Sequence, residues 1–315
     1  MSFQNICTNY FLKFSERKFS YKSVRFGKNY SNAFKQYIEK DGQIISHFHD
    51  INLYSNKDRN VFNMVVEIPK FTNAKMEISK TAKLNPIMFD VKKGEIRNIK
   101  NLFPFHGYIW NYGALPQTWE NPFVKNNKTG IVGDNDPIDA CEIGSDIIET
   151  GTVLEVKVLG VLGMIDQGEM DWKLIVINTR DPLSDKMNDI SDVECEMPGL
   201  LEATRRWFQY YKVPEGKSQT QFAFNGEYRN REFSLNIIDE THGSWRSLIT
   251  GEIKSEIDWL VGVFVGPFLF PISVQMSPLA TALLESSPKD AWKYWRKKIF
   301  SKNLSQSAEM TNGIL

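Results

Sequence analysis

Cysteine is scarce in this 315-residue chain, and net charge is absent because 38 Lys and Arg residues balance 38 Asp and Glu residues. Cys7, Cys141 and Cys195 are too few and too scattered for a disulfide framework. They fit a reducing compartment, and we expect Cys141 to be a small buried apolar residue. Because the chain has no overall positive field to attract nucleic acid, we predict no nucleic-acid partner.

Motifs of several enzyme classes are also missing. The chain contains neither a GxxxxGK[ST] phosphate loop nor a GxGxxG dinucleotide-binding fingerprint. No Cys and His residues have zinc-finger spacing, and no Ser or Cys nucleophile pattern surrounds His49 or His106. We therefore expect both histidines to be structural.

The first 30 residues are rich in serine and aromatic residues, and Glu16 is their only acidic residue. This composition predicts a mitochondrial transit peptide over residues 1–30, and hence a location in the mitochondrial matrix. A solvated basic tail is the alternative. A secretory signal is excluded because no continuous apolar run is present. The basic residues of this segment are Lys13, Arg17, Lys18, Lys22, Arg25 and Lys28.

Residues 31–256 are expected to form one domain, and residues 257–315 form an atypical tail that is first apolar and then polar. Residues 259–276 approach the length of a membrane span. Two glycines and two prolines within them disfavour a spanning helix. Three interpretations stay open: membrane contact through residues 259–276, a packed strand-like segment, and a misplaced coding boundary.

Short strands dominate the expected fold. Residues 63–68 form an apolar run ended by Pro69, and residues 75–78 alternate polar and apolar side chains. In a strand of period two, Lys75 and Glu77 point to the same face. Further strands are expected at residues 108–109, 152–161 and 174–177. Many short strands at close spacing favour a closed or nearly closed barrel.

Two amphipathic helices are expected after the strands. Apolar residues recur at helical spacing over residues 201–211, and Pro214 and Gly216 end this segment. A second periodic stripe covers residues 233–248, with Gly251 as its stop. Both helices are expected to pack on the barrel, which places the chain in the mainly β, α+β class.

The segment GDNDPID, residues 133–139, carries the most chemical information. It places Asp134, Asp136 and Asp139 within six residues. Like charges this close together are unfavourable unless a cation lies among them. Carboxylate oxygens favour Mg²⁺, Mn²⁺ or Ca²⁺ over zinc. A calcium EF-hand is excluded, since Asp139 occupies the sixth position, where that loop requires glycine. A solvated acidic turn is the alternative.

A second acidic group strengthens the metal interpretation. Asp166, Glu169 and Asp171 follow about thirty residues later, and residues 166–169 form a turn that can return carboxylates to a strand end. Phosphate binding would need cations and hydroxyl donors as well. The candidates are Lys75, Arg97, Lys173, Lys212, Tyr108, Tyr112 and Tyr211, each of which could alternatively be an ordinary surface charge or a core tyrosine.

With these residues assembled, the chain resembles the soluble family I inorganic pyrophosphatases. Residues 134–139, DNDPID, are similar to the family pattern D-[SGDN]-D-[PE]-[LIVMF]-D. The resemblance extends over residues 37–250, and with its basic leader the chain is similar to the fungal mitochondrial members. Further matching segments are residues 48–51, 63–69, 73–77, 85–87, 105–113 and 181–183.

The resemblance implies a five-stranded OB-like barrel with flanking helices, a homodimer, and hydrolysis of diphosphate to two phosphates by direct attack of a metal-bound water. It implies several Mg²⁺ ions in each active site, with Mn²⁺ as a substitute. Asp134, Asp139 and Asp171 match ligands of the tightly bound activating ion. Glu77 and Asp166 match ligands of ions that arrive with the substrate.

The other matched residues handle the phosphates. Asp136, also counted among the metal ligands, matches the carboxylate that accepts a proton from the attacking water. Lys75 and Tyr112 match groups on the attacked phosphate. Arg97, Tyr211 and Lys212 match groups that hold the departing phosphate. Glu67, Tyr108 and Lys173 match supporting residues of the family site. Lys173 is also a candidate phosphate ligand. A non-catalytic binding or assembly subunit with the same fold is the alternative.

Two positions depart from the family. Trp110 stands where relatives usually carry histidine, and Lys70 replaces a common arginine. We expect the tryptophan to affect packing or subunit contact and to leave the neighbouring tyrosines in place.

Overall fold

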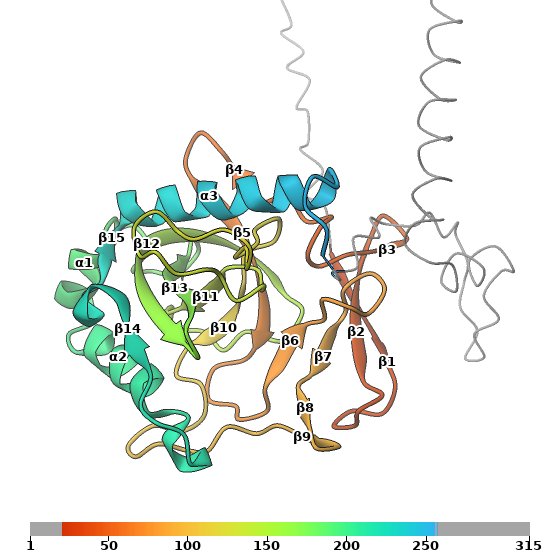
Figure 1. Cartoon of the computed structure of the whole chain (residues 1–315), viewed down its shortest axis with the longest axis horizontal. Helices are drawn as coiled ribbons and strands as arrows, with labels where there is room; N and C mark the ends of the chain where they lie inside the picture. The colour runs from red at the N-terminus through yellow and green to blue at the C-terminus, as the bar shows by residue number, and fades with distance from the viewer. Residues whose placement is uncertain (1–20, 256, 258–315) are drawn as a thin grey trace, which may run out of the picture.

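A closed ring of five strands forms the centre of the computed structural model, which describes residues 21–255 and 257 (Figure 1). Neighbouring strands pair in the order β12, β13, β11, β10 and β5, and a further pairing of β5 with β12 closes the ring. The expected barrel is therefore confirmed. Its strands are β5 (Val61–Ile68), β10 (Asn111–Ala114), β11 (Asp139–Glu142), β12 (Val153–Asp166) and β13 (Glu169–Asn178).

A smaller antiparallel sheet stands beside the barrel, and three short strands extend the barrel sheet. The order of the smaller sheet is β1, β2, β7 and β6, with β3 also paired to β2. Its strands are β1 (Lys22–Phe26), β2 (Lys35–Lys40), β3 (Gln43–Ile45), β6 (Met76–Ile78) and β7 (Ile87–Phe89). The remaining strands are β4 (Tyr54–Asn56), β8 (Val91–Lys92), β9 (Glu95–Ile96), β14 (Gln221–Phe222) and β15 (Arg229–Asn230).

Strand β1 lies inside the segment assigned to the leader. Its five residues pair with β2 from Lys22 opposite Glu39 to Phe26 opposite Lys35. The folded part of the chain therefore begins before residue 31. The first 20 residues and the apolar segment 259–276 lie outside the described residues. Within the described part, no helix has the length and apolar character needed to cross a membrane.

Strand β13 explains why an uninterrupted apolar run occurs in an antiparallel pair. Leu174 and Val176 belong to an apolar cluster that includes Ile237 and Ile238 of the last helix. The alternate residues, at 175 and 177, belong to the other cluster, with aromatic residues of helix α2. Both faces of the strand are buried, so alternation of polar and apolar residues is lost.

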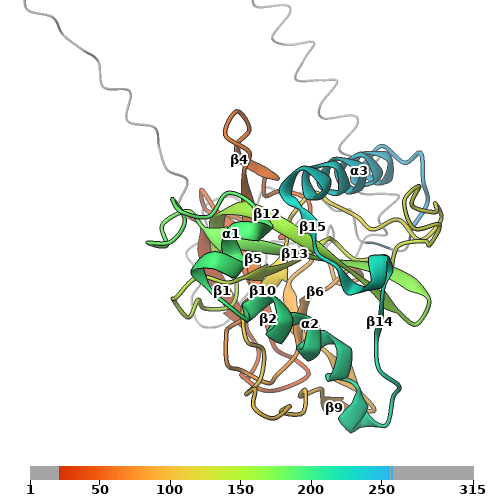
Figure 2. The ribbon, with the colours of Figure 1, turned by 90° about the vertical axis from the view of Figure 1, so that its left-hand side faces the viewer.

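Three α-helices cover the barrel. Figure 2 shows α1 and α2 on one side and α3 across another. Asp189 caps α1 through a capping box with Asp192, and Asn230 caps α3 by accepting a hydrogen bond from Phe233 N–H. Both expected helices are confirmed. The helices are α1 (Ile190–Glu196), α2 (Leu200–Tyr210) and α3 (Arg231–Ile249), with short 3₁₀ turns η1 (Val213–Glu215) and η2 (Ala223–Gly226).

The expectation of a strand at residues 108–109 is wrong. Gly107 has φ of 58°, and Tyr108 N–H donates to Thr72 C=O at 3.0 Å. The chain therefore turns here, and strand β10 starts only at Asn111. A Cβ at Gly107 would lie 2.3 Å from that same carbonyl oxygen, so the close approach requires glycine.

Candidate active site

One cavity of about 130 Å³ at the junction of the barrel and the smaller sheet is lined by every residue to which the family resemblance assigns a role. Barrel strands supply part of the lining, and the acidic loop before β11, Tyr108 and the segments around β6, β9 and the end of α2 supply the rest. Glu169, which the acidic pattern also included, is exposed at the hairpin end and does not line the cavity. The residues brought together are Glu67, Lys75, Glu77, Arg97, Tyr108, Tyr112, Asp134, Asp136, Asp139, Asp166, Asp171, Lys173, Tyr211 and Lys212.

The acidic loop before β11 is held in shape by its central asparagine. Asn135 has φ of 71°, a left-handed conformation that asparagine tolerates better than most residues. Its side-chain oxygen accepts a hydrogen bond from Trp119 Nε1 at 2.9 Å. Asp136 N–H donates to Asp134 Oδ1 at 3.0 Å. These contacts anchor Asn135 away from the cavity that Asp134 and Asp136 line.

The hairpin between β12 and β13 positions the second acidic group. Asp166 pairs with Glu169 across a two-residue turn in which Gln167 and Gly168 both have positive φ. The hairpin thus confirms the turn expected at residues 166–169. Parallel pairing of β11 with β13 then places Asp139 beside Lys173.

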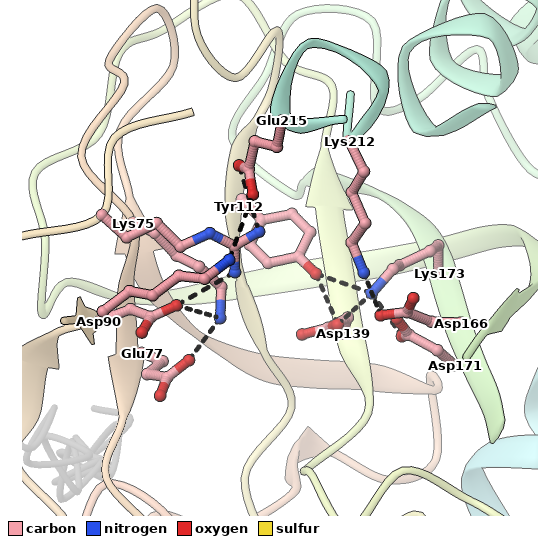
Figure 3. Close-up of polar contacts among 12 residues, drawn as sticks. Lys75, Glu77, Asp90, Tyr112, Asp139, Asp166, Asp171, Lys173, Lys212 and Glu215 are labelled. Atoms are coloured by element: carbon pink, nitrogen blue, oxygen red, sulfur yellow. Dashed lines mark hydrogen bonds and ion pairs between the residues drawn. The ribbon is translucent and has the colours of Figure 1, made fainter. Parts of the chain in front are cut away.

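Four residues form a barrel-side network: Tyr112, Asp139, Asp171 and Lys173 (Figure 3). Lys173 is 3% exposed and forms ion pairs with both Asp139 Oδ2 and Asp171 Oδ1. Its ammonium group also donates to Tyr112 OH at 2.9 Å, and that hydroxyl donates to Asp139 Oδ2 at 2.5 Å. Burial acts to lower the pKa of Lys173, but the two carboxylates outweigh it and raise that pKa well above its ordinary value.

A sheet-side network lies opposite, with Lys75, Glu77, Asp90 and Glu215 labelled in Figure 3. Arg97 also belongs to this network. Lys75 Nζ lies 2.5 Å from Glu77 Oε2 and 3.3 Å from Asp90 Oδ2. Arg97 joins Asp90 at 3.2 Å to Glu215 at 3.5 Å. The shared face predicted for Lys75 and Glu77 is confirmed, because their side chains meet. Asp90 and Glu215 were not found from the sequence, since no acidic motif surrounds either one.

The end of helix α2 closes a third side of the cavity. Lys212, buried just after the helix, forms an ion pair with Asp166. Tyr211 stacks on Trp207 with ring centroids 5.0 Å apart. Desolvation lowers the pKa of Lys212, whereas burial raises the pKa of Tyr211 above its ordinary value, so the tyrosine keeps its proton at neutral pH.

Burial raises the pKa of Asp134, Asp136 and Asp171, which line the cavity. Burial is the largest cause for Asp134, whose pKa lies well above the ordinary range, and nearby carboxylates add to it. Burial raises the pKa of Asp171 to about 7, against the opposing effect of Lys173. Desolvation in the cavity also raises the pKa of Asp136, although Lys80 opposes this rise. These shifts show that negative charge is under-compensated at this end of the cavity.

The donor set fits a hard divalent cation. Ligand oxygens of Glu120, Asp134 and Asp171 all lie within 4.8 Å of one another. Glu120 is 2% exposed, and its Oε2 has no hydrogen-bond partner. All three are carboxylates, the oxygen ligands that Mg²⁺ and Mn²⁺ prefer. Asp139, predicted to share the ion of Asp134 and Asp171, instead contacts Tyr112 and Lys173 here.

Two further residues escaped the sequence analysis. Glu120 lies 14 positions before Asp134, outside the acidic motif. Lys80 Nζ lies 2.5 Å from Asp136 Oδ1, although nothing near Lys80 in the sequence marks it. The signal available for Glu120 was a lone acidic residue outside any motif, which is too common to be specific.

The supporting residues hold the cavity walls. Glu67 Oε1 accepts a hydrogen bond from Ile78 N–H at 2.6 Å and so ties β5 to β6. Tyr108 is buried and packs against Tyr112 with ring centroids 5.4 Å apart. Trp110 is fully buried, stacks on Phe208 at 4.8 Å and donates to Thr204. Its effect is therefore on packing behind the tyrosines.

The remaining expectations concern the histidines, Cys141 and Lys70. His49 Nδ1 accepts a hydrogen bond from Trp245 Nε1 at 2.9 Å, in keeping with a structural role. His106 does not line the cavity. Cys141 is buried and has no disulfide bond, as expected for a small core residue. Lys70 is buried and donates to Gly144 C=O, so it braces a loop behind the site.

Known proteins share both the sequence and the fold. The family model described as inorganic pyrophosphatase matches residues 64–246. The inorganic pyrophosphatase of Zygosaccharomyces bailii is 53% identical over 235 residues, which is 75% of this chain and 82% of the relative. That of Candida albicans is 53% identical over 233 residues, covering 74% of this chain and 81% of the relative.

Solved structures agree with these relatives. The structure of inorganic pyrophosphatase from Schistosoma japonicum is similar with a TM-score of 0.76 and 51% identity, over 81% of this chain and 92% of the other. A truncated vacuolar soluble pyrophosphatase of Trypanosoma cruzi, solved in complex with PPi, is similar with a TM-score of 0.71 and 37% identity. That match covers 80% of this chain and 100% of the other.

Proposed function

The chain belongs to the inorganic pyrophosphatase family and hydrolyses diphosphate, and we propose that water attacks directly with Asp136 as its proton acceptor. The observation that carries the proposal is one cavity in which carboxylates and cations from distant parts of the chain come together. Diphosphate is a polyanion, so it requires cations from the protein or from bound metal to approach this acidic site. Among the residues lining the cavity, no serine or cysteine offers a nucleophile.

Asp136 suits the role of proton acceptor for two reasons. It lines the cavity, and 44% of its side chain is exposed, so water can reach it. Its pKa is raised above the ordinary value by desolvation, which makes it a stronger base at neutral pH than a solvated carboxylate. Lys80, 2.5 Å away, holds the carboxylate in place in the unliganded protein.

The cations of the cavity would bind the two phosphates. We assign Lys75 and Tyr112 to the attacked phosphate and Arg97, Tyr211 and Lys212 to the departing one. In the unliganded protein Lys75, Arg97 and Lys212 are all paired with carboxylates. Substrate oxygens would replace these partners, so the site gains phosphate contacts without leaving a buried cation unpaired.

We propose several Mg²⁺ ions for each site, with Mn²⁺ as a substitute. Asp134, Asp139 and Asp171 would hold the tightly bound ion, and Glu77 and Asp166 would hold ions that arrive with the substrate. When bound, such ions lower the pKa of the attacking water and neutralise phosphate charge. The protein side chains fix the direction of attack and remove the proton.

Phosphate release from diphosphate with Mg²⁺ tests the proposed proton acceptor. Asp136→Asn should fold and bind Mg²⁺ but lose about 10²–10⁴-fold in kcat, since it can no longer take the proton. Asp58→Asn, at an exposed residue outside the cavity, is the matched control and should retain activity. Near wild-type turnover in Asp136→Asn would contradict the assignment. No release by the wild-type protein with any divalent metal would favour a non-catalytic subunit.

The basic, acid-poor leader supports a second proposal, a location in the mitochondrial matrix. Import of the full chain into isolated mitochondria, followed by protease treatment, tests this location. A protein that stays outside and sensitive to protease contradicts it.

We also propose a homodimer, in keeping with the family resemblance. Sedimentation equilibrium tests this, and the mass of one chain at micromolar concentration would overturn it.

A further inference from the structure

Glu120 is fixed to the acidic loop through its backbone. Its N–H donates to Asp136 C=O at 2.8 Å, and its C=O accepts from Asn135 N–H at 2.9 Å. Gly133 permits this close approach, because a Cβ there would lie 2.4 Å from the Glu120 carbonyl carbon. The two segments run side by side, so Glu120 moves with the loop that carries Asp134.

The Glu120 side chain is aimed at the cavity carboxylates but only half satisfied. Oε1 accepts a hydrogen bond from Trp172 N–H at 2.9 Å, the residue between Asp171 and Lys173. Oε2 is buried without a partner, and the ligand oxygens of Glu120, Asp134 and Asp171 all lie within 4.8 Å of one another. Over residues 21–255, no lysine or arginine forms an ion pair with Glu120.

Glu142 shows what a purely structural buried glutamate looks like in the same barrel. It is 1% exposed, and both of its oxygens are paired. Oε1 accepts from the N–H groups of Gly144 and Asn178, and Oε2 accepts from Asn111 Nδ2 at 2.7 Å. An unpaired buried acceptor beside two further carboxylates is unfavourable unless a cation completes it.

We propose that Glu120 contributes Oε2 as a further carboxylate to the divalent cation assigned to Asp134, Asp139 and Asp171. The inference rests on the proposed metal dependence and adds a ligand from outside the DNDPID motif. It explains why Glu120, a buried carboxylate next to Asp134 and Asp171, has one oxygen without a hydrogen-bond partner. Through the Trp172 N–H, Glu120 also positions the strand that carries Asp171.

Direct titration of metal-free protein with Mg²⁺ by calorimetry tests the proposal. Glu120→Gln preserves size and the acceptor for Trp172 N–H, and we expect about 10–100-fold weaker binding of the first ion. Glu120→Asp keeps the charge with a shorter reach, so its affinity should lie between those of the wild-type protein and Glu120→Gln. Glu142→Gln is the matched buried control and should bind Mg²⁺ like the wild-type protein, with thermal denaturation in EDTA confirming that each variant folds.

The outcomes separate this inference from the proposed function. If the wild-type protein binds no Mg²⁺ or Mn²⁺, the proposed metal dependence fails. If the wild-type protein binds the ion and Glu120→Gln binds it within twofold, only the role of Glu120 is overturned. Should Glu120→Gln not fold, Glu120→Asp decides, because unchanged affinity with a shortened side chain also overturns the proposal.

Discussion

The two sides of the cavity differ in the length of their strands and in the exposure of their charged side chains. The barrel-side network stands on long strands, and its Asp171 and Lys173 side chains are only 7% and 3% exposed. The sheet-side network stands beside strands of two or three residues, and its Glu77 and Lys75 side chains are 47% and 28% exposed. Local opening is easier where fewer apolar contacts are buried. The barrel side is thus suited to hold a resident cation, and the sheet side to adjust to a substrate.

Charge balance differs in the same way. On the sheet side Lys75 and Arg97 share Asp90, so each cation has a carboxylate partner. On the barrel side, Asp134 and Glu120 have no ion pair among the described residues, and their pKa values are raised mainly by burial. Substitutions should therefore affect stability most on the barrel side and substrate affinity most on the sheet side.

The largest expected effect is on the barrel side. Lys173→Met should lower the free energy of unfolding of the metal-free protein by about 3–5 kcal/mol, since it leaves the Asp139 and Asp171 carboxylates buried without their shared cation. Urea denaturation in EDTA measures this. Lys186→Met, at an exposed lysine, is the control and should change little. A loss below 1 kcal/mol would show that the two sides do not differ as described.

The pH dependence of stability comes next. Because the folded-state pKa of Asp171 is raised to about 7 from an ordinary value of 3.8, the folded state binds this proton more tightly than the unfolded state. This contribution is present below about pH 4 and is lost as pH rises through about 7. Metal-free wild-type protein should therefore lose about 1–4 kcal/mol relative to Asp171→Asn between pH 5 and 8. If the free energy of unfolding depends on pH in the same way in the wild-type protein and in Asp171→Asn, the raised pKa of Asp171 is contradicted.

On the sheet side, a substitution should mainly lower kcat/KM for the substrate. Arg97→Ala removes a cation assigned to the departing phosphate, and we expect about a 10–100-fold lower kcat/KM, the value of one or two charged hydrogen bonds. Stability should fall by less than in Lys173→Met, because the side chains of the ion pairs lost are 15–21% exposed. Lys92→Ala is the control, since Lys92 pairs with the same Glu215 but is 54% exposed and outside the cavity. Equal losses of kcat/KM in Arg97→Ala and Lys92→Ala would argue against a phosphate contact by Arg97.

The smallest effect concerns the hairpin that carries Asp166 and Asp171. Gly168 has φ of 91°, and nothing lies within 4 Å of a Cβ placed there. Gly168→Ala should therefore cost about 1 kcal/mol through backbone strain alone. Gly243→Ala, in helix α3 with the same open space, should instead stabilise by about 0.5–1 kcal/mol. Thermal denaturation measures the change in stability of both variants. If both substitutions stabilise or both destabilise the protein, the strain argument is contradicted.

Much of the site could be predicted from the sequence because its residues occur in local patterns. The acidic loop, the turn at residues 166–169 and the strand ended by Pro69 all depend on neighbours in the chain. The strand expected at residues 108–109 failed because a contact with Thr72, 36 positions earlier, determines the backbone there. Glu120 and Lys80 were missed because each acts through a partner that is distant in the sequence. Asp90 was missed because no acidic motif surrounds it.

By itself the sequence determined a mainly β fold, a metal-binding acidic motif and the family, because strand periodicity and loop chemistry are local properties of the chain. Only the tertiary structure decided which charges meet. Closing the barrel brings Asp139 against Lys173, and packing of residues 119–121 against the acidic loop buries Glu120 next to Asp134 and Asp171. Those contacts depend on strand pairing between distant segments, and the free energy of a buried charge depends on all of its neighbours at once.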